Sequence, residues 1–196
     1  MSSLINKNKK RKCIALSCKK ILLEERINKL TIAQLAKEAN IGKGTIYEYF
    51  ENKEDIVLEL NTLLYENYRE NIYEKIEKEK DYREKIKLFL TLIYEDKFNC
   101  HRKIFKKFIG ITYSSENNSI IEFQRNWYKE NFEYLKVLIK ESSENKRLIN
   151  NDINVDELVD SIINTMLGFF LLSFFTKSIS ETQHDIKKYI NSIYKK

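Results

Sequence analysis

Apolar residues recur at helical spacing along the chain, and residues that commonly begin helices precede most of these segments. No segment shows the alternation of apolar and polar residues that is typical of a strand. The 196 residues include no proline and four glycines, so few positions disfavour a helix. We therefore expect an all-α protein with a proper hydrophobic core. The expected helices cover about 9–26, 32–39, 43–50, 53–78, 81–98, 101–113, 119–143, 155–177 and 181–194.

Short polar residues followed three positions later by an acid or an amide mark several of these helix starts. In this arrangement the first side chain accepts a hydrogen bond from the backbone of the third helical residue, and a long acid or amide side chain can reciprocate. Asn40 is expected to end the second helix, because asparagine tolerates the left-handed conformation. The pairs at helix starts are Thr31 with Gln34, Asn52 with Asp55, Asn154 with Glu157 and Ser180 with Gln183.

The stretch NIGKGTIYEYF, residues 40–50, places two of the four glycines around Lys43. A phosphate-binding loop would need an earlier glycine where Lys37 stands and a hydroxyl residue where Gly44 stands. The preceding segment also has helical rather than strand spacing. The stretch therefore fits a tight turn between two short helices, as in DNA-binding proteins, better than a nucleotide-phosphate loop.

The third short helix has two different sides. Ile46 and Phe50 are four residues apart, so both are expected to point inward. The opposite side carries a cation, a hydroxyl group and two phenols, which we expect to be exposed. In the alternative, the phenols cover the core and only their hydroxyl groups reach water. The residues of this opposite side are Lys43, Thr45, Tyr47 and Tyr49.

The net charge of +6 is unevenly distributed. Residues 1–53 hold 12 Lys and Arg against 5 Asp and Glu, which gives +7, and the remaining 23 against 24 give −1. This asymmetry predicts an N-terminal module that meets a polyanion. The run KNKKRK at residues 7–12, taken alone, is equally compatible with a solvated tail.

The cysteines and histidines do not indicate a metal site or an active site. Cys13, Cys18 and Cys100 form no Cys-x-x-Cys pair, so we expect buried thiols, no metal and a reducing cytoplasm. His101 and His184 lie near no serine or cysteine arrangement of the kind that an enzyme would need. We therefore expect neither catalysis nor a cofactor.

No membrane segment is expected. The first 12 residues lack the apolar core of a signal peptide. The longest apolar stretch, residues 162–175, is interrupted by Asn164 and is shorter than the ~18–20 residues of a membrane span. We expect this stretch to form a buried helix.

Residues 9 to about 60 resemble the DNA-binding domain of TetR-family transcriptional regulators. In that family the turn and recognition helix typically read vskgTlYyyFksKedLl, and IGKGTIYEYFENKEDIV matches this pattern in register. Arg26 and Asn40 stand where the family usually has glycine. Asparagine can adopt the same backbone conformation as glycine at position 40, whereas Arg26 leaves the end of the first helix undefined.

The resemblance implies a three-helix, helix-turn-helix DNA-binding domain over residues 1–53, with its third helix in the major groove. It also implies a helical ligand-binding and dimerisation domain over residues 54–196. Lys43, Gly44 and Tyr47 would face the bases or the groove edge, and Ala33 could touch only a thymine methyl group. The implied DNA-binding residues are Thr31, Ala33, Lys43, Gly44, Thr45, Tyr47, Tyr49 and Lys53.

For the C-terminal part, the family implies dimerisation through the last two helices and often a ligand pocket. A stripe of small residues allows close helix approach, which also suits packing within one chain. Aromatic residues of the central helices could line a pocket, although such residues also form cores. The interface candidates are Ser161, Ile162, Thr165, Met166, Gly168 and Phe169, and the pocket candidates are Phe105, Phe108, Tyr113, Phe123, Trp127 and Phe169.

The leading interpretation is a cytoplasmic, ligand-responsive repressor that binds a palindromic double-stranded DNA operator as a homodimer. Its effector would be a small, largely apolar molecule, and no membrane would be involved. The alternative is an architectural or cell-division factor that binds DNA through the same fold without an effector.

Overall fold

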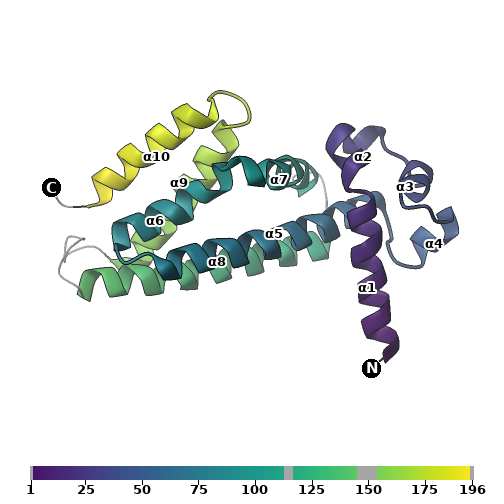
Figure 1. The fold of residues 1–196 in the computed structure, drawn as a ribbon, viewed down its shortest axis with the longest axis horizontal. Coiled ribbons are helices and arrows are strands. Elements are labelled where there is room, and N and C mark those ends of the chain that lie inside the picture. The colour runs from purple at the N-terminus through teal and green to yellow at the C-terminus, as the bar shows by residue number, and fades with distance from the viewer. Residues whose placement is uncertain (1, 113–116, 145–153, 195–196) are drawn as a thin grey trace. The chain divides into compact units, whose positions relative to one another are not determined.

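The computed structural model describes residues 2–112, 117–144 and 154–194, and these residues contain helices and no strand (Figure 1). The predicted all-α fold is thus confirmed. The α-helices are α1 (Ser2–Ser17), α2 (Lys19–Glu24), α3 (Ile32–Glu38), α4 (Lys43–Tyr47), α5 (Lys53–Lys78), α6 (Tyr82–Thr91), α7 (Asn99–Thr112), α8 (Asn118–Glu144), α9 (Val155–Leu172) and α10 (Ile179–Ile193). Short 3-10 helices are η1 (Ile27–Lys29), η2 (Leu92–Tyr94) and η3 (Asp96–Phe98).

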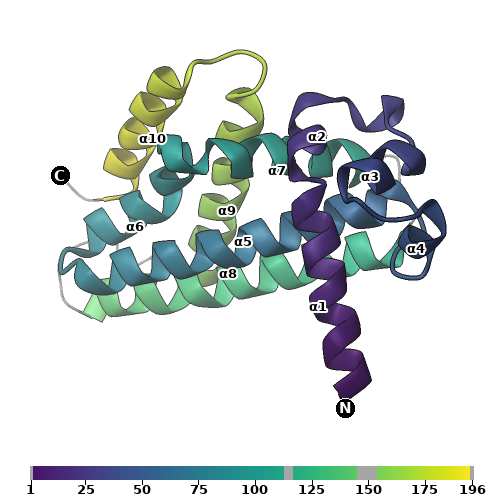
Figure 2. The ribbon, with the colours of Figure 1, turned by 45° about the vertical axis from the view of Figure 1, so that its right-hand side comes forward.

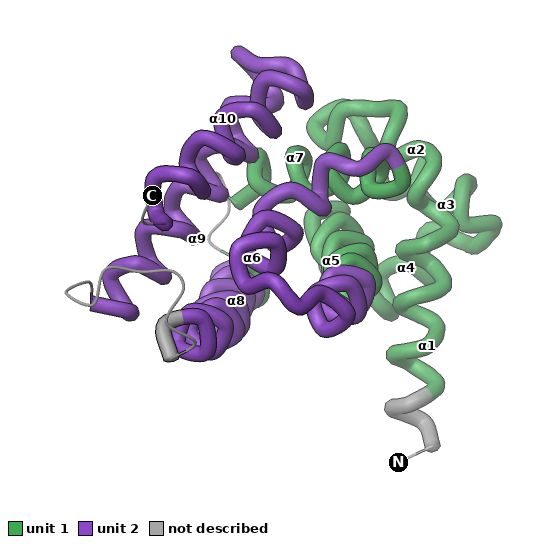
Figure 3. Tube along the Cα trace, turned by 60° about the vertical axis from the view of Figure 1, so that its left-hand side comes forward, with its two compact units in different colours: residues 1–69, 97–120 green, residues 70–96, 121–196 purple. Residues whose placement is uncertain are grey.

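The chain divides into two compact units (Figure 3). Unit 1 comprises Met1–Arg69 and Lys97–Ile120, and unit 2 comprises Glu70–Asp96 and Ile121–Lys196. Both α5 and α8 therefore contribute residues to each unit. The functional boundary expected between residues 53 and 54 stays a prediction, since compactness does not measure function.

The first expected helix, 9–26, is two helices in unit 1. A local break falls at Cys18, although the bonds from Cys18 N to Ile14 O (3.1 Å) and from Leu22 N to Cys18 O (3.0 Å) keep the helical pattern. The Cys18 thiol is buried as expected and donates to the carbonyl oxygen of Leu35 (3.5 Å), but Cys13 is exposed and Cys100 is half-buried. Helix α2 ends at Glu24, because Glu25 and Arg26 are extended.

Unit 1 has a core formed by helices distant in sequence. Its fully buried or nearly fully buried side chains include Ile14, Leu22, Leu35, Ile46 and Phe50. The inward direction predicted for Ile46 and Phe50 is therefore confirmed. The first turns of α1 extend beyond α3 and α4 of the same unit (Figure 2).

In unit 2, α10 packs against α6 and α9. The start predicted for α10 at Ser180 and Gln183 is wrong, because Ser178 and Glu181 form the capping box two residues earlier. The charged Glu181 also suits the positive end of the helix dipole better than a neutral amide does. Asn154 caps α9 as expected, but its side chain accepts from Asp156 N rather than pairing with Glu157.

Two of the expected helices are shorter in the structure. Helix α9 ends at Leu172, whose carbonyl accepts from Thr176 N (2.9 Å) and Lys177 N (3.2 Å) in the turn that follows. The expected helix 81–98 is divided into α6, η2 and η3. None of the described helices is both long and apolar enough to cross a membrane.

Candidate nucleic-acid interface

Helix α3 begins at a reciprocal cap. Thr31 Oγ1 accepts from Gln34 N (3.2 Å), and Thr31 N donates to Gln34 Oε1 (2.9 Å). This confirms the capping box predicted from the sequence. Because both side chains are held by the cap, the first turn of α3 is fixed, with Ala33 exposed on it.

The turn between α3 and α4 depends on Asn40. Its φ of 53° lies in the left-handed region, and Ile41 N donates to Ala36 O (3.0 Å) to close the end of α3. Gly42 and Gly44 do not adopt positive φ, so the special backbone conformation falls on the asparagine. A Cβ added to Gly44 would meet nothing within 4 Å, so this glycine leaves an open surface on α4.

Helix α4 presents the predicted polar side over fewer residues than expected, since it ends at Tyr47 instead of Phe50. Tyr47 is 53% exposed, and the Nζ atom of Lys43 lies 5.9 Å from the centroid of its ring. Thr45 and Tyr49 are half-buried. The alternative in which the phenols cover the core therefore does not describe Tyr47, although it fits Tyr49 in part.

Arg11 holds the end of the recognition segment in place. Its Nε atom donates to Glu59 Oε2 (3.1 Å), its Nη1 atom donates to the carbonyl oxygen of Tyr49, and its guanidinium lies 4.4 Å from the Phe50 ring centroid. The basic run that contains Arg11 is thus not only a solvated tail. Sequence spacing gave no indication of these contacts, because they join α1 to positions 38 and 48 residues away.

Lys53, for which the resemblance implies a phosphate contact, stands at the first position of α5. Its Nζ atom donates to the carbonyl oxygen of Leu30 (3.1 Å) and is partly buried. The start of α5 is capped by Asn52, which accepts from Asp55 N (2.9 Å). An ammonium has three donors, so Lys53 can hold the segment before α3 and still reach a phosphate.

The implied DNA-binding residues thus lie on or directly beside α3 and α4 and at the start of α5. Their exposed members offer a hydroxyl, a methyl group, an ammonium and a phenol, together with backbone that no side chain covers at the glycine. This combination can contact phosphates through charge and hydrogen bonds and a groove through the phenol. The exposed members are Thr31, Ala33, Lys43, Gly44 and Tyr47, and the half-buried members are Thr45, Tyr49 and Lys53.

The other predicted sites are distributed over both units. The pocket candidates Phe105 and Phe108 belong to unit 1, with Phe108 fully buried, whereas Phe123, Trp127 and Phe169 belong to unit 2. Tyr113 lies outside the described residues. Across the described part of the chain, no three His, Cys, Asp or Glu side chains gather as metal ligands would.

The interface candidates on α9 differ in exposure. Ile162 has no exposed surface in the single chain and belongs to the core of unit 2, and its assignment to a dimer interface stays a prediction. Ser161 Oγ lies 3.3 Å from the Tyr189 hydroxyl, and the Phe169 and Tyr189 rings are 6.2 Å apart, so part of the stripe packs on α10. The remaining candidates, Thr165, Met166 and Gly168, are half-buried.

The short helices α3 and α4, the turn at Asn40 and the exposed side of α4 define a helix-turn-helix protein. The family model described as bacterial regulatory proteins, tetR family, matches residues 20–60. YhgD of Bacillus subtilis (strain 168), named an uncharacterized HTH-type transcriptional regulator, is 34% identical over 79 residues, or 39% of this chain and 41% of that protein. Matches with curated relatives span 20–41% of those proteins.

Solved structures match nearly the whole chain. A transcriptional regulator from Saccharomonospora viridis, in complex with choline, has a TM-score of 0.80 at 16% identity over 96% of this chain and 99% of that one. FadR from B. subtilis, in complex with stearoyl-CoA, has a TM-score of 0.68 at 18% identity over 91% and 96%. Such identities show the fold alone. The family match over residues 20–60 and this shared fold together support a TetR-family transcriptional regulator.

Proposed function

We propose that this protein is a repressor that binds a palindromic DNA operator as a homodimer and releases it when a small molecule binds. The observation that carries the proposal is the exposed side of α4, where Lys43 and Tyr47 stand free of the core while Ile46 fixes the helix from behind. Two such helices in a symmetric dimer could meet two half-sites together.

The proposed contacts divide into two kinds. Lys43, Gly44 and Tyr47 face the groove, and Ala33 adds at most a methyl contact with thymine. Thr31, Thr45, Tyr49 and Lys53 face phosphates, which fix the position of the protein but do not read the sequence. The excess positive charge of residues 1–53 adds to the attraction.

The proposed effector is a small, largely apolar molecule in the cytoplasm. The structures similar to this chain were solved with choline in one case and stearoyl-CoA in another, so the fold accommodates different ligands. Three pocket candidates, Phe123, Trp127 and Phe169, lie in unit 2, and they supply the apolar surface that such a ligand would need. No catalytic step belongs to this proposal.

In vitro selection of random duplex DNA by the purified protein tests the DNA-binding part. We expect enriched sites with two inverted half-sites whose centres are about one helical turn, ~34 Å, apart. On such a site, the logarithm of the affinity should fall linearly with the logarithm of salt concentration, with a slope set by ~6–10 phosphates. Selection that enriches no sequence, or affinity that does not depend on salt, would contradict the proposal.

A further inference from the structure

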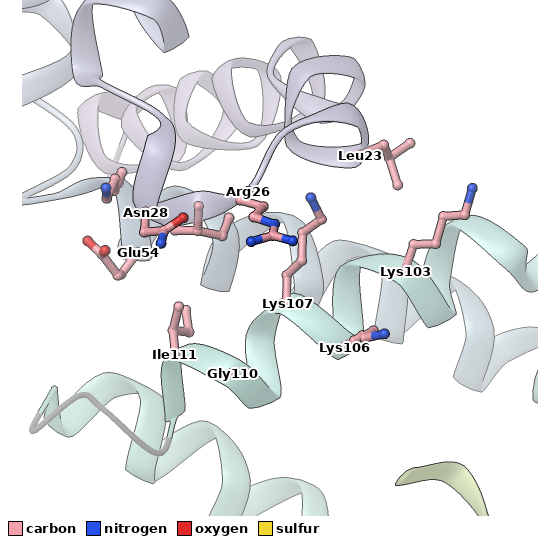
Figure 4. A pocket seen from close by; sticks show the side chains of 11 residues that line it. Leu23, Arg26, Asn28, Glu54, Lys103, Lys106, Lys107, Gly110 and Ile111 are labelled. Atoms are coloured by element: carbon pink, nitrogen blue, oxygen red, sulfur yellow. The ribbon is translucent and has the colours of Figure 1, made fainter. Parts of the chain in front are cut away.

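A pocket of about 600 Å³ lies within unit 1, among the α2–η1 segment, the start of α5 and α7 (Figure 4). Its volume is within the range of small-molecule sites. None of the aromatic pocket candidates lines it. Its charged lining is strongly basic, with one acid among five cations: Arg26, Lys53, Lys103, Lys106 and Lys107, with Glu54.

The positive charge of this pocket is not fully neutralised by acids. The Lys107 side chain rises from α7 (Figure 4). Its Nζ atom donates to the backbone oxygen of Glu25, a neutral acceptor. Arg26 and Lys103 are exposed and form no ion pair in the part of the chain that the structure describes. Burial lowers the pKa of Lys107, and Lys103 lowers it further, although Glu25 opposes the shift. An anion placed among these cations would relieve their repulsion.

The same pocket also has an apolar part. Leu23 of α2, Ile27 of η1 and Ile111 of α7 line it. A Cβ added to Gly110 would meet nothing within 4 Å, so the α7 side of the pocket is open. A ligand that fits both parts would carry a negative group joined to an apolar body.

We propose that this pocket binds a small molecule in which a phosphoryl group is attached to an apolar body. The phosphoryl oxygens would accept hydrogen bonds from Arg26, Lys103 and Lys107, because guanidinium and ammonium groups bind phosphate well. The apolar body would lie against Leu23, Ile27 and Ile111. The concave shape and the apolar lining favour a small molecule over the phosphates of a DNA duplex.

Such a ligand would connect α7 to the segment that leads into the helix-turn-helix. Helix η1 is followed by Leu30 and then by Thr31, the cap of α3, and Lys53 already holds the Leu30 carbonyl. A ligand bound between η1 and α7 would restrict this segment and so alter the affinity for DNA. This regulatory part rests on the proposed function, whereas the binding part does not.

Binding is tested on the whole protein without DNA, with hexyl phosphate and inorganic phosphate as probes at constant ionic strength. We expect hexyl phosphate to raise the melting temperature saturably. Calorimetric titration should show it binding about 10-fold more tightly than inorganic phosphate, because its chain buries apolar surface. The double variant Arg26→Gln, Lys103→Gln should lose about 10-fold in affinity for hexyl phosphate. Both residues are exposed, so circular dichroism should show an unchanged fold.

Lys20→Gln is the matched control, because Lys20 is exposed on α2 outside the pocket and the substitution also removes positive charge. The proposal is overturned if hexyl phosphate does not bind saturably, if the control loses as much affinity as the double variant, or if both probes bind equally.

The phosphates of DNA are the other source of phosphate groups for this cluster of cations. A separate titration with operator DNA, without either probe, tests this source. If the double variant loses operator affinity there, the cluster is a DNA contact and the pocket proposal is wrong. Failure of operator binding by the wild type would contradict only the proposed function.

Discussion

Tyr47 has a large exposed ring on a helix whose other side is fixed in the core. Ile46, the residue before it, has no exposed surface, so the backbone of α4 cannot easily shift to bury the tyrosine. An aromatic ring that is 53% exposed contributes less to the free energy of unfolding than a buried one does. Its presence at this position is therefore better explained by a contact with another molecule.

Replacing Tyr47 with alanine should weaken operator binding by about 5–30-fold, because a hydrogen-bonding and packing contact of about 1–2 kcal/mol is lost. The urea midpoint of unfolding should stay the same. Fluorescence anisotropy with the selected operator measures the affinity. Tyr128→Ala, which removes a tyrosine that is 40% exposed on α8, is the control and should bind like the wild type. Equal affinity for Tyr47→Ala and wild type would remove this residue from the interface.

His101 is a second residue whose environment has a measurable consequence. Neither ring nitrogen has a hydrogen-bond partner, and the ring lies 5.1 Å from that of Phe98. Burial lowers the pKa of His101, the charges of Lys19 and Arg102 act in the same direction, and together they bring it to about 4. In the unfolded chain the pKa returns to about 6.5.

Stability should therefore fall as the pH is lowered from about 6.5 to about 4, because in this window the unfolded chain binds a proton at His101 that the folded chain does not. Above pH 6.5 the imidazole is neutral in both the folded and the unfolded chain, so the stability is not reduced by the titration of His101. His101→Phe keeps a ring against Phe98 and removes the titration. Urea unfolding at pH 7 and pH 5 should show a smaller loss of stability for the variant than for the wild type. Equal losses would show that His101 is not buried in its neutral form.

At the scale of elements, local patterns predicted helices well and their ends less well. Thr31 with Gln34 was found because a capping box is complete within four residues. The contacts of Arg11 could not be found, because the sequence does not show which distant helix a side chain will meet. Lys103, Lys106 and Lys107 share one face of α7 by spacing, but only the fold places Arg26 opposite them.

The start of α10 shows how two overlapping patterns are resolved. Ser178 with Glu181 and Ser180 with Gln183 have the same spacing, and the structure uses the first pair. The Ser178 hydroxyl accepts from Glu181 N (3.2 Å), and Ser178 N donates to Glu181 Oε2 (2.8 Å). Since α10 packs against both α6 and α9, its first turn affects the stability of unit 2.

Ser178→Ala should lower the free energy of unfolding by about 1 kcal/mol, because the cap is lost. Ser180→Ala should change it by less than about 0.5 kcal/mol, since Ser180 is an exposed helical position. Urea denaturation, monitored by circular dichroism, measures both changes in the free energy of unfolding. The reverse order of effects would place the helix start at Ser180 after all.

For the whole molecule, the proposed function requires two copies of the chain, because a palindromic operator presents the same half-site twice, in inverted orientation. Two recognition helices held in one particle bind far more tightly than either helix alone, since the second contact becomes intramolecular. Helix α9 is the proposed contact helix. Its residue Gly168 is half-buried, and a Cβ added there would meet nothing within 4 Å.

Gly168→Arg therefore tests dimerisation with little effect on the fold of the single chain. If a second copy approaches α9 closely, the arginine side chain should raise the dimer dissociation constant about 10-fold or more, because overpacking a tight contact costs about 1–3 kcal/mol. Sedimentation equilibrium measures this constant, and anisotropy should show a parallel loss of affinity for the full operator but not for a single half-site. Asn126→Arg, at an exposed position of α8, adds the same charge and should leave both constants unchanged. A Gly168→Arg protein that dimerises like the wild type would show that this face of α9 is not the contact between copies.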